Sequence, residues 1–290
     1  MQFGLFLIWC MSRLPWPLLR GAGEVFGLLF CWSSAYRRRI VRINLRLCFA
    51  HLPETERTKL LHEHFKAAGR SLVERGVLWW SSAEAIRKMV RLEGMHHLEQ
   101  FQGHPVILLA PHFVGLDMGA LRLSMELPIA AVYGPQRNKR MDAFISRGRT
   151  RFGGMELISR KLGPRPILAA VREGKPLYYL PDQDYGRRNA VFANFFGVPA
   201  STLTALPRLA KMADAIVVPC VTYQTKQGYV TRLYPPWSDY PTNDVDADTR
   251  TMNAFIEERV REAPAQYYWL HRRFKTRPTG QASFYRSTDR

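Results

Sequence analysis

Two side chains near the middle of the chain have the types and spacing needed for proton transfer. His112 and Asp117 lie in the segment VILLAPHFVGLDMGAL (106–121), and Asp117 is the first aspartate of the chain. A carboxylate that binds one ring nitrogen of a histidine fixes its tautomer and leaves the other nitrogen as a base. No serine or cysteine lies in this segment. We therefore expect direct deprotonation of a substrate hydroxyl.

The spacing of this pair decides how the two side chains could meet. On one continuous α-helix, residues i and i+5 are about 140° apart, so the side chains would diverge. They can meet if His112 precedes the helix that carries Asp117, and Pro111 and Gly115 favour a turn there. A structural role for the pair stays the alternative.

Short apolar runs that alternate with helical patterns must position these residues. Strands are expected at 106–110, 129–133, 155–159, 176–180, 215–223 and 228–236, and helices near 112–126, 139–152, 164–173, 201–213 and 246–263. This alternation predicts an α/β fold with a mixed, largely parallel sheet flanked by helices. His112 then lies at the carboxyl end of a strand, the edge where open α/β sheets bind ligands.

The N-terminal residues 1–35 form a separate apolar segment. Arg13, Arg20 and Glu24 interrupt it, and a membrane span needs about 20 mostly apolar residues. Tryptophans 9, 16 and 32 are typical of a bilayer interface. We predict a membrane-associated helical anchor that lies on the bilayer. A buried hairpin and a single tilted span stay as alternatives.

The segment YRRRIVRINLRLCF (36–49) reads as a helix with two parallel stripes. Apolar Ile40, Ile43 and Leu47 lie beside an arginine stripe at positions 39, 42 and 46. Such a helix suits a membrane surface with anionic head groups. A solvated face of a basic protein is the alternative. A second helix is expected over 52–80.

The whole chain is strongly basic. Lys and Arg total 42 against 24 Asp and Glu, which gives a formal net charge of +18. Such a charge favours polyanions, namely nucleic acid, anionic lipid or an acidic carrier protein. No nucleic-acid motif occurs, so no nucleic-acid partner is expected, although a basic nucleic-acid-binding module stays the rival from another class. The four scattered cysteines contain no C-x-x-C pair, which indicates buried free thiols and no metal site.

Four blocks of the sequence resemble those of a known family. The H-x4-D of His112 and Asp117 resembles the signature of the glycerolipid-type acyltransferases. The other blocks are YRRRIVRINLRLCF (36–49), LPDQDYGRRNAVFANFFGVPASTLTALPRLA (180–210) and PAQYYWLHRRFKTRP (264–278). Together they resemble the late acyltransferases of lipid A biosynthesis in Gram-negative bacteria.

The resemblance implies an acyltransferase domain over residues 36–290, behind an anchor at residues 1–35. It implies an enzyme at the cytoplasmic face of the bacterial inner membrane. Such an enzyme moves a fatty acyl chain from acyl carrier protein to a hydroxyl of a lipid A precursor, a phosphorylated glycolipid, and forms an acyloxyacyl ester. The carrier-protein thioester is the donor, so no cofactor is implied. Another membrane lipid as acceptor, such as a lysophospholipid or an amino-acid lipid, stays the alternative.

Carried over residue by residue, the resemblance makes His112 the general base and Asp117 its orienting carboxylate. The thioester oxygen gains negative charge during attack, and backbone amides near residues 113–115 are candidate donors to it. Six further residues are expected to bind substrate: Arg137, Asn138, Asp182, Gln183, Arg272 and Arg273. Arginine binds phosphate in a bidentate manner. A structural role for Asp182 is an equal alternative.

One block departs from the family pattern. The family often reads Tyr-Arg-x-x-Asn-Pro where this chain has YGPQRNK (133–139), with Gly134 in place of arginine and Lys139 in place of proline. Arg137 is the expected substitute for the missing cation. A basic surface loop is the alternative for Arg137.

Overall fold

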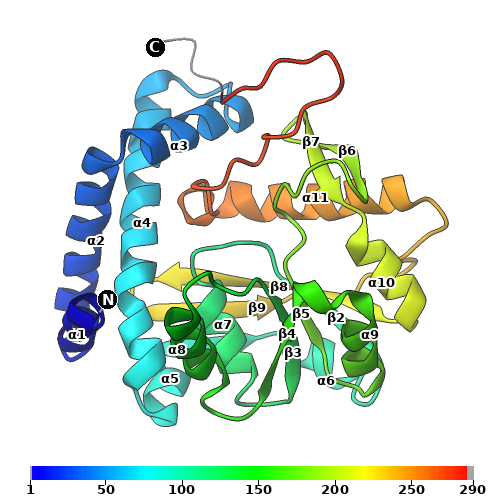
Figure 1. Ribbon diagram of the computed structural model, residues 1–290, viewed down its shortest axis with the longest axis horizontal. Coiled ribbons are helices and arrows are strands. Elements are labelled where there is room, and N and C mark those ends of the chain that lie inside the picture. The colour runs from blue at the N-terminus through cyan, green and yellow to red at the C-terminus, as the bar shows by residue number, and fades with distance from the viewer. Residues whose placement is uncertain (1, 286–290) are drawn as a thin grey trace.

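The chain folds around a seven-stranded sheet in a computed structural model that describes residues 2–285 (Figure 1). The strands are β1 Val90–Glu93, β2 Val106–Leu109, β3 Ile129–Tyr133, β4 Met155–Ser159, β5 Leu177–Tyr179, β6 Ala190–Phe195, β7 Val198–Leu203, β8 Ile216–Thr225 and β9 Gly228–Leu233. The helices are α1 Gln2–Met11, α2 Trp16–Ser33, α3 Ala35–Cys48, α4 Glu54–Trp80, α5 Ala83–Met89, α6 His96–Glu99, α7 Leu116–Leu123, α8 Lys139–Thr150, α9 Pro164–Arg172, α10 Ala205–Ala213 and α11 Val245–Glu262. Two 3-10 turns, η1 Arg160–Leu162 and η2 Pro264–Gln266, complete the order.

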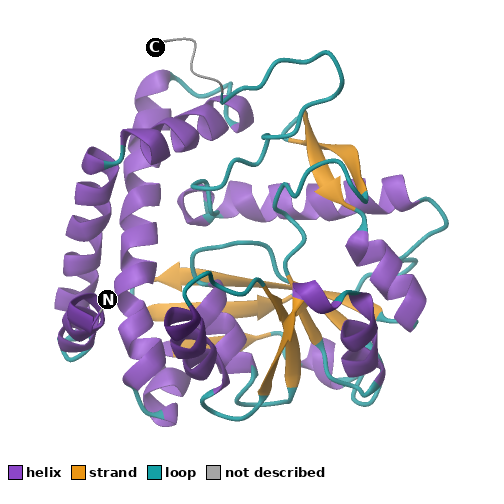
Figure 2. Cartoon of the chain, viewed as in Figure 1, coloured by secondary structure: helices purple, strands orange, loops and turns teal. Residues whose placement is uncertain are grey.

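The large sheet is mostly parallel. Its order is β1-β9-β8-β2-β5-β3-β4, and only β8 and β9 pair in antiparallel fashion. Strands β6 and β7 form a separate antiparallel hairpin. Figure 2 shows the sheet between layers of helices. The predicted α/β class with a largely parallel sheet is confirmed.

Each face of the sheet packs on its own set of helices. In β2, Ile107 and Leu109 join a core with α9, α10 and α11, whereas Val106 and Leu108 face α6 and α7. Every residue of β2 is buried, as expected for a central parallel strand covered on both faces. The strand therefore forms a rigid support for the residues that follow it.

The N-terminal helices pack on α4, which lies beside the sheet (Figure 1). Gly27 of α2 is so close to α4 that an added Cβ would lie 2.1 Å from the carbonyl oxygen of Phe65. Across the same interface Arg70 binds Glu24 at 2.6 Å, and Arg20 lies 3.7 Å from buried Glu74. Among the described residues, no helix is both long and apolar enough to cross a membrane.

Three of the strands are not predicted from the sequence. Strand β1 is short, β6 lies where no element is predicted, and β7 overlaps the start of the helix predicted over 201–213. That helix begins at Ala205 because residues 198–203 pair with β6 instead. The β-branched Thr202 is fully buried in this hairpin, as its propensity for strands allows.

Candidate active site

Two neighbouring strands bring His112 and Asp182 together. Leu109 of β2 and Tyr179 of β5 are partners in the parallel register, and the amide of Ala110 donates to the carbonyl of Tyr179 at 2.9 Å. His112 and Asp182 each lie three residues beyond this pair. The carboxyl ends of adjacent parallel strands share one sheet edge, so the two side chains meet there.

The contact between His112 and Asp182 fixes the imidazole at two points. Nδ1 of His112 lies 2.6 Å from Oδ1 of Asp182, and the backbone amide of His112 donates to Oδ2 at 2.9 Å. Asp182 is 1% exposed, and burial would raise its pKa, but the imidazole lowers it to about 2. Asp182 is therefore ionised and holds Nδ1, which leaves Nε2 of His112 for a substrate.

Asp117 lies at the same cleft but has other partners, which corrects the expectation that it orients His112. Arg149 donates to Oδ1 of Asp117 at 2.8 Å, and Arg75 donates to Oδ2 at 3.2 Å. Burial would raise the pKa of Asp117, but these two guanidinium groups outweigh burial and lower it. The physical reason is that α7 begins at Leu116, so Asp117 sits in its first turn and projects toward α4 and α8.

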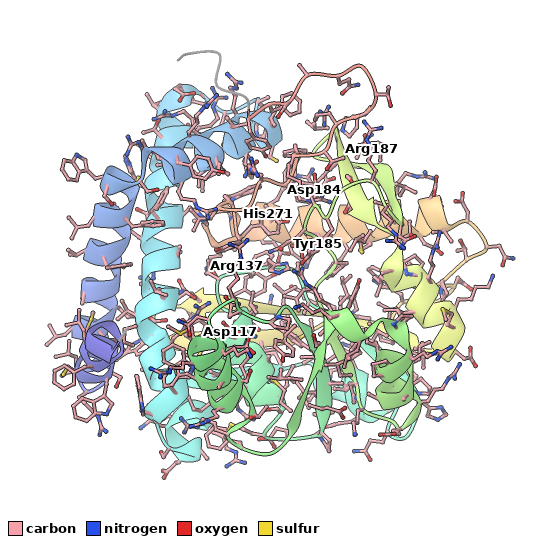
Figure 3. All side chains as sticks on the ribbon, in the orientation of Figure 1. Asp117, Arg137, Asp184, Tyr185, Arg187 and His271 are labelled. Atoms are coloured by element: carbon pink, nitrogen blue, oxygen red, sulfur yellow. The ribbon has the colours of Figure 1, made fainter. Side chains whose placement is uncertain are left out.

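A cleft of about 480 Å³ opens over these residues. Its polar lining includes His112, Asp117, Arg75, Arg149, Arg160, Gln183, Tyr185 and Tyr268. Its apolar lining includes Leu116, Ala120, Ala131, Met155, Leu157 and Tyr178, which belong to α7 and strands β3 to β5. Figure 3 shows the labelled Asp117, Tyr185 and His271 in this part of the molecule. The cleft thus joins His112 to an apolar recess.

The backbone amides expected to receive an oxyanion are partly engaged. The amide of Phe113 donates to the carbonyl of Pro111 at 2.7 Å, and that of Val114 donates to Gln266 at 2.9 Å. The cationic groups that line the cleft are instead the guanidinium groups of Arg75, Arg149 and Arg160.

The C-terminal block supports the site from behind. The amide of Tyr268 donates to the carbonyl of His112 at 2.8 Å. Nε2 of His271 accepts from the amide of Asp184 at 3.0 Å. Burial, with smaller contributions from Arg273 and His112, lowers the pKa of His271 to about 4, so this ring is neutral at pH 7. His271 therefore positions the loop after Asp182.

The N-terminal arginine-rich block reaches the same C-terminal segment. Asn44 is fully buried, and its amide donates to the carbonyls of Trp269 and His271 at 2.8 Å each. Its side-chain oxygen accepts from the hydroxyl of Tyr285. The asparagine of the first block thus holds the last block in place.

The two expected C-terminal arginines have different surroundings. Arg273 is 1% exposed, donates to the carbonyl of Ser201 at 2.9 Å and to Thr202 Oγ1 at 2.8 Å, and lies over Phe195. This burial contradicts the expectation that Arg273 meets a substrate phosphate, because its guanidinium is used inside the protein. Arg272 is partly exposed, and its side chain forms no ion pair with any residue from 2 to 285.

The remaining expected residues divide between the cleft and its rim. Gln183 lines the cleft and accepts a hydrogen bond from the hydroxyl of Tyr185 at 3.3 Å. Asn138 caps α8, because its side-chain oxygen accepts from the amides of Arg140 and Met141. Arg137 is exposed near the opening (Figure 3). Asn138 therefore has a helix-capping role that its sequence motif did not indicate.

Sequence reasoning missed three residues that line the cleft, Arg75, Arg149 and Arg160. Arg160 lies against the gap left by Gly134, since a Cβ at that position would be 3.3 Å from its guanidinium carbon. One signal was available: α8 carries Arg147 and Arg149 with no acidic residue in its second half.

The four cysteines are free thiols, as expected, and three of them are buried. Among residues 2–285, no group of three or more His, Cys, Asp or Glu side chains could hold a metal ion.

The fold is of the α/β class, and its cleft is lined by a histidine, His112, at the end of a strand. A family model described as bacterial lipid A biosynthesis acyltransferase matches residues 1–276. The chain belongs to this family, and it is therefore an acyltransferase of lipid A biosynthesis.

Similar proteins agree with this membership. The chain is 35% identical to the lipid A biosynthesis palmitoleoyltransferase of Escherichia coli K12, over 98% of this chain and 93% of that protein. It is 34% identical to the lauroyltransferase (97% and 93% covered) and 34% identical to the myristoyltransferase (94% and 84% covered) of the same organism. A solved 1-acyl-sn-glycerophosphate acyltransferase from Thermotoga maritima is remotely similar, with a TM-score of 0.40 and 12% identity over 86% of this chain and 99% of that one.

Proposed function

We propose that this chain transfers a fatty acyl chain from acyl carrier protein to a hydroxyl group of a lipid A precursor. The product is an acyloxyacyl ester. The observation that carries the proposal is the 2.6 Å contact between His112 and Asp182 at the mouth of a cleft with an apolar recess. A buried, ionised carboxylate on Nδ1 makes Nε2 a base and stabilises the imidazolium that forms.

The proposed reaction proceeds in two steps. Nε2 of His112 takes the proton from the acceptor hydroxyl as its oxygen attacks the thioester carbonyl carbon. The tetrahedral intermediate then collapses, the carbon–sulfur bond breaks, and the sulfur leaves with the proton from the imidazolium. The products are one ester and one free thiol, and no oxidant or cofactor is needed.

The charge that develops on the thioester oxygen needs a positive partner. Arg75 and Arg149 are held in place by Asp117, which binds both guanidinium groups. We assign to these two arginines the stabilisation of negative charge in the cleft, on the thioester oxygen or on a substrate phosphate. Asp117 then acts as a positioning residue for cations.

The N-terminal helices are proposed to bind the cytoplasmic surface of the bacterial inner membrane. Leu18, Val25, Leu29 and Trp32 of α2 are 58–81% exposed, and their spacing of 7, 4 and 3 residues places them on one helix face. Phe6 and Trp9 of α1 are also exposed. Large exposed apolar surfaces of this kind mark interaction sites, and tryptophan suits a bilayer interface.

The membrane proposal is tested on the exposed face, because α2 is also part of the protein core. Deletion of residues 1–32 would also remove the packing of Gly27 on α4. Point substitutions on the exposed face avoid this loss of core packing. Leu29→Glu with Trp32→Glu should abolish binding to anionic phospholipid vesicles in a sedimentation assay. Leu162→Glu, at a distant exposed leucine, serves as the control and should leave binding unchanged. Full binding by the double variant would refute the assignment.

The enzymatic proposal is tested with purified full-length protein in detergent. Acyl carrier protein carrying a laurate thioester is incubated with a lipid A precursor that has free hydroxyacyl chains. The expected result is one new ester on the lipid, detected by mass, and one free thiol for each ester formed. Thiol release without a gain in lipid mass would make the protein a thioesterase under these conditions and would contradict the proposal.

A further inference from the structure

A basic ridge with one exposed leucine borders the cleft at the end of β4. We define the basic ridge as Arg160, Lys161, Leu162 and Arg165, which belong to η1 and the first turn of α9. All four side chains are exposed, and Leu162 is 65% exposed. A single exposed leucine is common on protein surfaces, so its meaning depends on its surroundings.

The cations of the basic ridge have no carboxylate partners. Residues 157–172 contain four basic residues and no acidic one. Within residues 2–285, none of the three ridge cations forms an ion pair. By contrast, Lys175 of the nearby loop is neutralised by Glu156 at 2.8 Å and Glu173 at 3.0 Å. The ridge therefore presents uncompensated positive charge around an apolar side chain.

The basic ridge is continuous with the cleft that holds His112. Arg160 lines that cleft, and its guanidinium lies 5.6 Å from the centre of the Tyr185 ring. The loop after β3 also reaches the cleft, because Gln136 lines it, and the exposed cations Arg137, Lys139 and Arg140 follow. A partner bound on the ridge would therefore place a flexible arm at the cleft mouth.

We propose that the basic ridge is the docking surface for the acidic carrier protein that delivers the thioester. This inference rests on the proposed function. An acidic protein is the occupant that fits an uncompensated cationic surface with a single apolar contact, since charges steer the encounter and a leucine provides a desolvated anchor. A bilayer fits less well, because the broad apolar surface lies on α1 and α2 instead.

The test measures the activity of a charge-reversed ridge variant with two different acyl donors. Lys161→Glu with Arg165→Glu should raise the KM for acyl carrier protein thioester at least about tenfold, because the variant repels an acidic partner. The same variant should keep wild-type turnover with an acyl-pantetheine thioester, which has no protein to dock. Leu162→Ser should raise the KM for the protein donor in the same selective way.

The matched control reverses two exposed cations of α10, which packs beside α9 on the same face of the sheet and contributes no residue to the cleft lining. Arg208→Glu with Lys211→Glu changes the net charge by the same amount and should leave both KM values unchanged. Equal losses with both donors in the ridge variant would show that the ridge binds the acceptor or serves catalysis, and would overturn the proposal. An unchanged KM for the protein donor would also overturn it.

A binding titration makes the result independent of turnover. Isotope-labelled holo-carrier protein is titrated with wild-type protein and with the ridge variant, and shifts in its NMR signals are measured. Saturable binding that is weakened by added salt and lost in Lys161→Glu/Arg165→Glu supports the assignment of the ridge as the docking surface. Absent binding to the wild type, or equal binding to both proteins, would overturn it. If binding follows the ridge but no ester forms, the proposed chemistry fails while the docking surface stands.

Discussion

The two aspartates at the cleft, Asp117 and Asp182, have opposite kinds of partner. Asp182 binds the imidazole of His112 at 2.6 Å, whereas Asp117 binds the guanidinium groups of Arg149 and Arg75. Both carboxyls have lowered pKa values, Asp182 mainly because of His112 and Asp117 because of its two arginines. Burial opposes ionisation at both sites and is outweighed at both. The same residue type thus binds an imidazole at one site and two guanidinium groups at the other.

The difference shows that sheet register outweighs distance along the sequence. Asp117 is five residues from His112 but lies in the first turn of α7, which directs its side chain toward α4 and α8. Asp182 is 70 residues away, yet it follows β5, the strand paired with the one before His112. Each parallel strand delivers its next loop to the same edge, so residues far apart in sequence become partners.

The largest expected effect is that of Asp182→Asn. An asparagine fills the same space but does not stabilise an imidazolium and favours the wrong tautomer of His112. Turnover should fall about 10³- to 10⁴-fold, by analogy with the triad of serine proteases. Steady-state kinetics measure the loss, with circular dichroism to confirm the fold. Activity within tenfold of wild type would contradict the role of Asp182 in orienting His112 and stabilising its imidazolium.

Asp117→Asn should have a smaller effect. The change leaves the proposed base intact but frees Arg75 and Arg149, so we expect kcat/KM to fall about 10- to 100-fold. Asp117→Glu should recover part of this loss because it restores the charge. If Asp117→Asn is more damaging than Asp182→Asn in the same assay, the roles assigned to the two carboxylates are reversed.

The adjacent Arg272 and Arg273 provide a second contrast, between a partly exposed and a buried side chain. Arg273→Met would remove the charged donors to the carbonyl of Ser201 and to Thr202 Oγ1, and should lower the free energy of unfolding by about 3 kcal/mol. Arg272→Met should change it by less than about 0.5 kcal/mol. Urea denaturation measures both. Equal stability of the two variants would contradict a structural role for Arg273.

The smallest expected effect is a loss of folding stability at acid pH that comes from the buried His64 and not from the aspartates of the cleft. Burial lowers the pKa of His64 from 6.5 to about 4, so the unfolded chain takes up this proton before the folded chain does. Stability is therefore lost as pH falls below 6.5, by about 2 kcal/mol at pH 5 from this residue.

Urea denaturation at pH 7 and pH 5 measures this loss. In His64→Gln, the loss of stability between pH 7 and pH 5 should be smaller by about 2 kcal/mol. Asp182→Asn should show the same loss between pH 7 and pH 5 as the wild type. The pKa of Asp182 is about 2, so the contribution of this carboxylate to stability is lost only below pH 4. An unaltered loss in His64→Gln would refute the assignment.

Much of the fold follows from the periodicity of the sequence. The long apolar runs at 106–110 and 129–133 become central strands, because a parallel strand covered on both faces needs continuous hydrophobicity. The strands β6 and β7 were not predicted, because their residues 190–203 alternate weakly and include Asn194 and Pro199. Their pairing is set by tertiary contact with α11, where Asn253 donates to the carbonyl of Asn194.

The candidate site was predicted in part. His112 could be placed at a strand end from local sequence alone, and Asp182 was expected near the substrate. The pairing of these two residues depends on which strands are neighbours, and periodicity does not encode strand order. The burial of Arg273 was equally hidden, because an HRRF motif does not show which arginine points inward.

The most direct test of the central claim is the mass of lipid A from living cells. A Gram-negative strain that lacks its own late acyltransferases would express the wild-type chain or His112→Ala, at levels matched by immunoblot. We predict that lipid A gains the mass of one acyl chain with the wild type and gains nothing with His112→Ala. The same gain from His112→Ala would contradict His112 as the base, and no gain from the wild type would contradict the proposed function itself.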